Sequence, residues 1–363
     1  MIRYYMPTEI FRGEGSLKQA GDRLAQLGNK ALIVTGRRSA RVSGALPDLL
    51  EVLKKLDIDH YHFDSIEENP ELSVVQEGAG LFRVNRCDFV IGIGGGSPID
   101  AAKAISVIAA NDLEQRACYQ PDQITRAYPI VAIPTTAGTG TEATPYSVIS
   151  DRKLKKKAGF GNPLMFPTLS FCDPVYTLSL PERVTIDTAI DALSHLLEGL
   201  YSRKRCDLLF PLIYDGIKTI INYLEPAVKN PDNLRYRDKL LTASLYGGLV
   251  IAQSSTTLQH SIGYPLTTHY GLSHGKANGV VMRFIMELFR PAVDNELQRL
   301  FQHVGLEREE FYIWLDRWLT DPDLQLPEDF ITSATEEILG SRNMAQNPLQ
   351  VSGEEIKKIL RKL

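Results

Sequence analysis

Two clusters of histidine and aspartate are the residues in this chain best suited to chemistry. In HSIGYPLTTHYGLSH, His260, His269 and His274 lie close together, and further upstream Asp191 and His195 are four positions apart in DALSHLLEG. The latter spacing places both side chains on one face of a helix, where a carboxylate and an imidazole can share a metal ion. An exposed Asp–His pair without a metal is the alternative. With His260 and His274 added, one oxygen and three nitrogens would suit Fe²⁺, Zn²⁺ or Co²⁺ better than Ca²⁺ or Mg²⁺.

Three glycines between a predicted strand and a predicted helix form a second candidate site. The segment DFVIGIGGGSPIDAAKAI passes from an apolar run into helical spacing through Gly94, Gly95 and Gly96. Glycines expose backbone N–H groups to a ligand and a helix N-terminus adds partial positive charge, so we expect a diphosphate to bind here. We also expect Ser97 to cap the helix and Pro98 to lie in its first turn. A flexible turn without a ligand is the alternative, and the usual G-x-G-x-x-G fingerprint does not fit.

A threonine-rich loop follows the next predicted strand. In PTTAGTGTEATP, Thr135, Thr136 and Thr139 stand among glycines. Their hydroxyls and accessible N–H groups suit ribose, phosphate or a nicotinamide amide, although an ordinary polar turn has the same composition. Because open α/β sheets bind ligands at the carboxyl ends of their strands, two such loops at adjacent strand ends favour a nucleotide site.

The elements that must position these residues change character along the chain. In the first half, short strand-like runs alternate with helical spacing, which predicts a mostly parallel sheet covered on both faces. In the second half the β-branched runs disappear and helical periodicity continues. We therefore expect an α/β dinucleotide-binding domain at 1–177 and an all-α domain, with the metal and substrate sites, at 178–363. The predicted strands cover residues 31–35, 60–64, 88–93, 129–133 and 169–173.

Composition and charge limit the classes of partner. The chain has 363 residues, with 40 Lys and Arg, 44 Asp and Glu, and a formal net charge of −4. Proteins that bind nucleic acid or anionic membranes usually carry a basic excess, so neither is expected as the main partner. The N-terminal residues lack a signal-peptide pattern, no apolar run approaches about 20 residues, and the four scattered cysteines indicate reduced thiols. We expect a cytoplasmic protein.

The ordered set of motifs resembles the iron-containing (group III) alcohol dehydrogenase family. GGGSPIDAAKAI, PTTAGTGTE, DALSHLLEG and HSIGYPLTTHYGLSHGKANGVVM occur in the family's order, and the resemblance extends from PTEIFRGEGSL to QNPLQVSGEEI. It implies two domains, a nicotinamide cofactor in the cleft between them, a homodimer, and one divalent metal, with Fe²⁺ expected before Zn²⁺.

The resemblance also assigns roles to individual residues. It implies that Asp191, His195, His260 and His274 hold the metal and are catalytic through it, whereas His269 matches no ligand position and is expected in solvent or at the rim of the cleft. A metal with an open coordination position would ease deprotonation of an alcohol. The implied cofactor contacts are Asn69, Gly95, Gly96, Ser97, Asp100, Thr135, Thr136, Thr139 and Lys157.

Two positions depart from the family pattern. Many members carry a proton-relay histidine four residues after the third ligand, where this chain has Tyr264, which we expect to shape the pocket and to be a poor relay at neutral pH. Many NAD-using members have an acidic residue after the first strand, where this chain has Gly36, followed by Arg37, Arg38 and Ser39. Loss of the carboxylate beside two arginines favours a ribose 2′-phosphate, hence NADP(H), with NAD(H) as the alternative. The alternative is that both arginines are ordinary solvated loop residues, which would leave the choice between NADP(H) and NAD(H) undecided.

These observations lead to one expected function and two alternatives. We expect a metal-dependent alcohol dehydrogenase or aldehyde reductase (EC 1.1.1.-) that transfers a hydride between NADP(H) and a small alcohol or aldehyde. A dehydroquinate-synthase-like or glycerol-dehydrogenase-like enzyme of the same fold is one alternative, and the complete Asp/His/His/His set speaks against it. A catalytically impaired nucleotide-binding protein is the other, because Tyr264 replaces the relay histidine.

Overall fold

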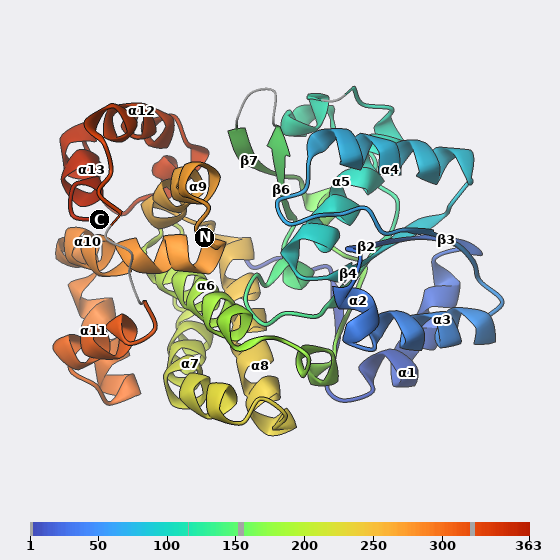
Figure 1. Cartoon of the computed structure of the whole chain (residues 1–363), viewed down its shortest axis with the longest axis horizontal. Helices are drawn as coiled ribbons and strands as arrows, with labels where there is room; N and C mark the ends of the chain where they lie inside the picture. The colour runs from blue at the N-terminus through green and yellow to red at the C-terminus, as the bar shows by residue number, and fades with distance from the viewer. Residues whose placement is uncertain (1–2, 115, 152–155, 320–323) are drawn as a thin grey trace.

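The computed structural model describes residues 3–114, 116–151, 156–319 and 324–363, and Figure 1 shows a sheet-containing half beside a helical half. Within the described residues, a six-stranded parallel sheet has the order β1-β8-β5-β4-β2-β3. Its strands are β1 (Glu9–Arg12), β2 (Lys30–Thr35), β3 (Asp59–Phe63), β4 (Phe89–Gly94), β5 (Ile130–Pro134) and β8 (Leu169–Cys172). The predicted mostly parallel sheet is confirmed, and all five predicted strands are present.

Both faces of the sheet are covered, which explains why its central strands are apolar at consecutive positions. Along β2, Leu32 and Val34 pack with helices α4 and α5, whereas Ala31 and Ile33 pack on the opposite face with α1 and α3. Neighbouring residues of a strand point to opposite faces, so a sheet buried on both sides needs a continuous apolar run. Figure 1 shows these two helical layers on either side of the sheet. The helices are α1 (Ser16–Ala20), η1 (Gly21–Gln26), α2 (Ser39–Val42), α3 (Ala45–Lys55), α4 (Leu72–Val84) and α5 (Gly96–Asn111).

Helix α5 begins one residue before the predicted cap. Gly95 occupies the N-cap position in an extended conformation and has no side chain to cap the helix, so the expectation that Ser97 is the N-cap is wrong. The hydroxyl of Ser97 instead accepts a hydrogen bond from the backbone N–H of Asn69 at 3.3 Å. The first N–H groups of α5 are therefore not occupied by a side-chain cap, as an anion-binding turn requires.

Two β elements were not predicted from the sequence. Strand β1 lies at the edge of the sheet beside β8, and β6 (Tyr146–Asp151) pairs with β7 (Lys156–Gly161) in an antiparallel hairpin. Short 3₁₀ helices connect this region: η2 (Ala117–Tyr119), η3 (Pro121–Gln123), η4 (Thr141–Ala143), η5 (Pro163–Met165) and η6 (Pro174–Thr177). The predicted boundary between residues 177 and 178 lies at the end of η6.

The second half is helical and surrounds one long buried helix. Helix α6 (Glu182–Tyr201) packs against three others, and its residues from 189 to 201 are all buried. Among the described residues, no helix is both long and apolar enough to cross a bilayer. The remaining helices are α7 (Phe210–Lys229), α8 (Leu234–Ser254), α9 (Leu258–Tyr270), α10 (His274–Val304), α11 (Arg308–Asp316), α12 (Glu328–Leu339), η7 (Arg342–Gln346) and α13 (Gly353–Leu360).

Candidate metal centre and nucleotide loops

Helix α6 presents the carboxylate and the first imidazole of the candidate metal centre. Asp191 and His195 lie one turn apart and are 3% and 5% exposed, which is unusual for polar side chains. His195 Nε2 is 4.0 Å from Asp191 Oδ1. The predicted spacing on one helix face is thus realised inside the core of the helical half, where an unpaired charge is costly. This burial disfavours the alternative of an ordinary exposed Asp–His pair.

Two further imidazoles come from the histidine-rich segment, which covers most of α9 and ends at the first residue of α10. His260 Nε2 lies 3.9 Å from Asp191 Oδ1, and His274 Nε2 lies 3.8 Å from the same oxygen. Single ligand atoms of Asp191, His195 and His260 lie within 4.8 Å of one another. His269 is exposed and its ring contacts Phe330, away from this group.

The protonation pattern of the imidazoles fits a cation. His195 donates from Nδ1 to the carbonyl of Gly138 at 3.2 Å, and His260 donates from Nδ1 to Glu198. In neutral imidazoles the Nε2 atoms of both rings then carry lone pairs, and these atoms face each other at 3.1 Å. Two such lone pairs repel unless a cation or a shared proton lies between them. Two nitrogens about 2.1 Å from one ion lie about 3.0–3.4 Å apart, and the observed 3.1 Å falls in that range. The residues therefore fit a divalent metal.

Asn278, on α10, completes the surroundings of the ligand group. Its Nδ2 donates to Asp191 Oδ1 at 3.1 Å and lies 3.2 Å from His260 Nε2 and 3.4 Å from His274 Nε2. A polarised N–H₂ group thus faces three acceptor atoms at once. This convergence of acceptors is the arrangement that a metal ion also requires.

The three imidazoles differ in the direction of their pKa shifts and in the groups that contact their rings. Burial lowers the pKa of His195 and lowers that of His274 strongly, which favours their neutral, metal-binding forms. Burial alone would also lower the pKa of His260, but the Glu198 carboxylate raises it above its usual value. Among the described residues, Nδ1 of His274 has no hydrogen-bond partner. The ring of His274 is instead stacked on Tyr264, with centroids 5.6 Å apart and planes 4° from parallel.

Tyr264 contacts both the metal-ligand candidate His274 and the polar residue Lys157. Its ring is 5.8 Å from the Nζ of Lys157, and its hydroxyl is hydrogen-bonded to Asn343. Burial raises the pKa of Tyr264. The phenol therefore remains protonated near neutral pH, and it is a donor rather than a base.

The two polar loops predicted to bind the cofactor lie against each other. A Cβ on Gly95 would approach Thr136 to 3.2 Å, and one on Gly96 would approach Thr139 to 3.0 Å. The threonine loop lies against the first turn of α5 and leaves little room for a side chain at either position. The carboxyl ends of β4 and β5 are in register, with Gly94 opposite Pro134, so Thr135 begins its loop beside the glycines.

Asn69 and Lys157 are brought to the same place from distant parts of the chain. The Nζ of Lys157 donates to Asn69 Oδ1 at 2.7 Å, and the backbone N–H of Asn69 reaches Ser97. Asn69 has a φ of 56°, a conformation that asparagine tolerates better than most residues. Burial lowers the pKa of Lys157, and Asp191 and Asp100 oppose that shift. Asn69, Ser97 and Lys157 thus form one polar group at the turn.

Asp100 and Lys103, both on α5, hold the segment from Thr141 to Val148 by hydrogen bonds. Asp100 accepts hydrogen bonds from the hydroxyl of Thr141 at 2.6 Å and the N–H of Val148 at 2.9 Å. The fully buried ammonium of Lys103 donates to the carbonyl and hydroxyl of Thr141 and to the carbonyl of Tyr146. In this structure the carboxylate of Asp100, a predicted cofactor contact, therefore binds other residues of the protein.

The segment after β2 lies at the same edge of the sheet as the glycine turn after β4. Thr35 is opposite Ile93, so Gly36 follows its strand beside the glycine turn. Arg37 and Arg38 are exposed, Arg37 lies 4.0 Å from Glu67, and Ser39 begins α2. The predicted 2′-phosphate donors are therefore near the predicted diphosphate turn and accessible.

Sequence reasoning missed Glu198, Asn278 and Lys103. Each lies three or four residues after a predicted site residue, namely His195, His274 and Asp100, and so shares its helix face. That spacing was a usable signal. Their partners, however, come from other helices or loops, and no local pattern identifies those partners.

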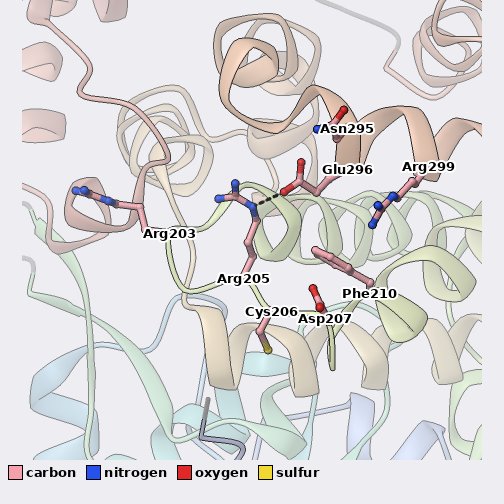
Figure 2. A pocket seen from close by; sticks show the side chains of 8 residues that line it. All are labelled: Arg203, Arg205, Cys206, Asp207, Phe210, Asn295, Glu296 and Arg299. Carbon is pink, nitrogen blue, oxygen red and sulfur yellow. Dashed lines mark hydrogen bonds and ion pairs between the residues drawn. The ribbon is translucent and has the colours of Figure 1, made fainter. Parts of the chain in front are cut away.

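A surface pocket elsewhere is not part of this site. Its lining side chains come from the segment between α6 and α7, the first residue of α7 and helix α10 (Figure 2), and its volume is about 460 Å³. Arg205, which points into it, already donates to Glu296 and to the carbonyls of Ser202 and Ala292. The pocket is lined by Arg203, Arg205, Cys206, Asp207, Phe210, Asn295, Glu296 and Arg299.

Comparisons with known proteins cover both halves of the chain. The model of the family described as iron-containing alcohol dehydrogenase matches residues 7–174, and that of the C-terminal part of the Fe-containing alcohol dehydrogenase family matches residues 185–363. A crystal structure of an iron-containing alcohol dehydrogenase from Thermotoga maritima has a TM-score of 0.94 and 36% identity, with 100% of this chain and 99% of that chain covered.

Two curated relatives have named substrates. A 1,3-propanediol dehydrogenase of Citrobacter freundii is 32% identical, over 78% of this chain and 74% of that protein. An NAD-dependent methanol dehydrogenase of Bacillus methanolicus is 30% identical over the same shares of the two chains.

Proposed function

The chain belongs to the iron-containing alcohol dehydrogenase family, and we propose that it transfers a hydride between NADP(H) and a small alcohol or aldehyde at one divalent metal. The observation that carries this proposal is the pair of Nε2 atoms of His195 and His260, 3.1 Å apart beside the Asp191 carboxylate. We propose Asp191, His195, His260 and His274 as the ligands, with Fe²⁺ the expected ion and Zn²⁺ the alternative.

The metal ligands and the cofactor loop are in direct contact, which supports a shared reaction site. The hydrogen bond from His195 Nδ1 to the Gly138 carbonyl joins helix α6 to the threonine loop. A divalent ion held here would act as a Lewis acid toward the oxygen of an alcohol or aldehyde, while the cofactor carries the hydride. The chain's own contribution is positioning: the loops hold the dinucleotide, and the buried imidazoles keep acceptor atoms directed at one point.

Tyr264 shapes the site without serving as a proton acceptor. Because burial raises the pKa of its phenol, loss of the phenolic proton is disfavoured further at neutral pH. We propose that protons exchange with water or through a ribose hydroxyl of the cofactor. The ring holds His274 by stacking and limits the space beside the ligand group.

The proposed preference for NADP(H) rests on the segment from Gly36 to Ser39. This segment begins beside the glycine turn, lacks a carboxylate that would repel a 2′-phosphate, and exposes two guanidinium groups. Hydrogen bonds to a charged group contribute about 1.5–3 kcal/mol. The methanol dehydrogenase named above is NAD-dependent, so the proposal is specific to this chain's own loop.

The proposed activity is tested by a screen of short alcohols and aldehydes on iron-reconstituted protein with both nicotinamide cofactors. We expect metal-dependent hydride transfer with a higher kcat/KM for NADP(H). Activity that persists unchanged in metal-free protein would contradict the metal assignment. A higher kcat/KM for NAD(H) would contradict the cofactor assignment alone.

We further propose a homodimer in the cytoplasm. The first half of this proposal rests on membership of the family and is checked by light scattering of the purified protein. A monomer at micromolar concentration would contradict it.

A further inference from the structure

Glu198 is a fully buried carboxylate that the hydride-transfer chemistry does not itself require. It lies on α6, three residues after His195, and its exposed fraction is 0%. Its two oxygens face four donors: the backbone N–H and hydroxyl of Thr257, and the backbone N–H and Nδ1 of His260. An ionised carboxylate in this position needs several donors, because a buried charge without them is costly.

The two carboxylate oxygens of Glu198 have different partners. Oε1 accepts from the backbone N–H of Thr257 at 2.6 Å, from its hydroxyl at 2.8 Å and from the backbone N–H of His260 at 3.3 Å. These donors belong to the N-terminal turn of α9, so Oε1 caps that helix. Oε2 accepts from Nδ1 of His260. One side chain of α6 thus fixes both the start of α9 and the imidazole that α9 carries.

The contact of Oε2 determines which nitrogen of His260 carries the proton. An ionised carboxylate accepts hydrogen bonds and donates none, so it holds the single proton of a neutral imidazole on Nδ1. Nε2 is then unprotonated, and it points toward Asp191 and His195. Metal-bound histidines commonly have such a carboxylate on the other ring nitrogen, and its loss weakens metal affinity.

We propose that Glu198 is a positioning residue that fixes the Nδ1–H form of His260 and thereby sets the affinity for the divalent ion. This inference rests on the proposed metal site. A purely structural role, capping α9, is the competing explanation. The two roles are separable because they use different oxygen atoms of the same carboxylate.

The Glu198→Gln substitution separates them. An amide that keeps its oxygen at the Oε1 position retains the bonds to Thr257 and to the N–H of His260. Its NH₂ group then faces Nδ1 of His260 and donates to it, which moves the imidazole proton to Nε2. The opposite amide orientation would place donors against the N–H groups of the helix, so it is disfavoured. The substitution therefore preserves the cap and blocks the metal-facing nitrogen.

The test is a Co²⁺ titration of metal-free protein, followed by the visible d–d absorption of the bound ion. We expect Glu198→Gln to bind Co²⁺ about 10–100-fold more weakly than the wild type. The thermal midpoint of the metal-free protein should change little, because the cap remains. Asn347→Ala is the matched control, since Asn347 Oδ1 accepts from Leu258 N–H in the same helix turn without touching His260. It should lower the thermal midpoint and leave Co²⁺ affinity within about twofold of wild type.

The outcomes distinguish this inference from the proposed function. If wild-type protein binds no divalent ion, the proposed metal site is wrong and the inference fails with it. If wild type binds Co²⁺ and Glu198→Gln binds it equally well, the inference alone is overturned.

A second measurement needs no variant. Histidine ¹⁵N NMR of the Zn²⁺-loaded wild type should show His260 protonated at Nδ1 and bound to the ion through Nε2. Coordination through Nδ1 would overturn the inference even if the glutamine variant fails to fold.

Discussion

His260 is the residue on which the ligand group depends most, because its Nε2 lies close to both Asp191 and His195. Replacing His260 by Ala should lower metal content and turnover severely, since one of four donors and the contact between two helices are lost. Metal analysis after purification and activity after iron loading measure this. His269→Ala is the control, because His269 lies on the same helix but is exposed. Full metal content in His260→Ala would contradict the ligand assignment.

Tyr264 is predicted to contribute shape rather than proton transfer. A Tyr264→Phe variant keeps the ring that stacks on His274 and removes only the hydroxyl. We expect most of the activity to remain, with an unchanged pH profile of kcat, because the buried phenol does not lose its proton near pH 7. A loss of about a thousandfold in kcat, the size expected for an essential acid–base group, would instead identify the tyrosine as a relay.

Glu142 is a residue from which we predict a pH dependence of folding stability that does not involve the metal. Among the described residues, neither of its carboxylate oxygens has a hydrogen-bond partner, and burial raises the pKa of Glu142 from 4.5 to about 7. Below pH 4.5 the folded and unfolded states are both protonated and no stability is lost. Between pH 4.5 and about 7 the unfolded state releases its proton first, so the folded state loses stability as the pH rises, by about 3 kcal/mol in total.

The Glu142→Gln variant checks this sign. An amide does not titrate, so the variant's thermal midpoint relative to wild type should be higher at pH 8 than at pH 5. Glu114→Gln, at an exposed position, should show the same difference from wild type at both pH values. An advantage of Glu142→Gln that is largest at pH 5 would contradict the predicted direction.

At the scale of secondary structure, elements with an uninterrupted local pattern were predictable and the others were not. Strand β2 is a short, continuous apolar run that is buried on both faces, and helix α6 is a long helix without proline. Helix α9 contains Gly263, Pro265 and two threonines, and these residues hide its periodicity although tertiary packing keeps it helical. The hairpin strand β7 is rich in lysine and glycine, which strands usually avoid.

The same limit applies to the candidate site. The spacing of Asp191 and His195 predicts a shared helix face, and the structure shows both side chains there. Glu198 has that spacing as well, but its function depends on Thr257 and His260, which come from a different helix. A relation between two elements cannot be read from the period of one of them.

The loop between β2 and α2 carries the prediction about cofactor choice. The double variant Arg37→Ala/Arg38→Ala should lower kcat/KM for NADP(H) by about tenfold or more, because hydrogen bonds to the 2′-phosphate are lost. The value for NAD(H) should stay within about twofold. Arg41→Ala removes an exposed arginine of the following helix, α2, and should change neither value. A Gly36→Asp variant is less informative, since a Cβ at Gly36 would lie 3.0 Å from the carbonyl of Ile66. An unchanged cofactor ratio in the double variant would contradict the assignment.

In the whole molecule, the sheet-containing half and the helical half lie side by side (Figure 1), and the candidate metal centre is in the helical half close to contacts between the two. Contacts across this junction include His195 with Gly138, Lys157 with Tyr264, and the Tyr146 hydroxyl with the carbonyl of Ile251. Three separate helices, α6, α9 and α10, supply the ligand candidates. A bound ion therefore connects helices that otherwise meet mainly through side-chain packing.

This connection predicts that the metal stabilises the folded chain. A ligand that binds only the folded state adds about 2.7 kcal/mol at a hundred times its Kd. For a domain of about 150–250 residues, each kcal/mol shifts the midpoint by about 2–4 °C. Removing the ion with a chelator should thus lower the thermal midpoint by about 5–10 °C, and added Fe²⁺ or Zn²⁺ should restore it. His260→Ala should show equal midpoints with and without chelator. If the wild-type midpoint responds to neither chelator nor added metal, the four residues do not hold an ion in the folded protein.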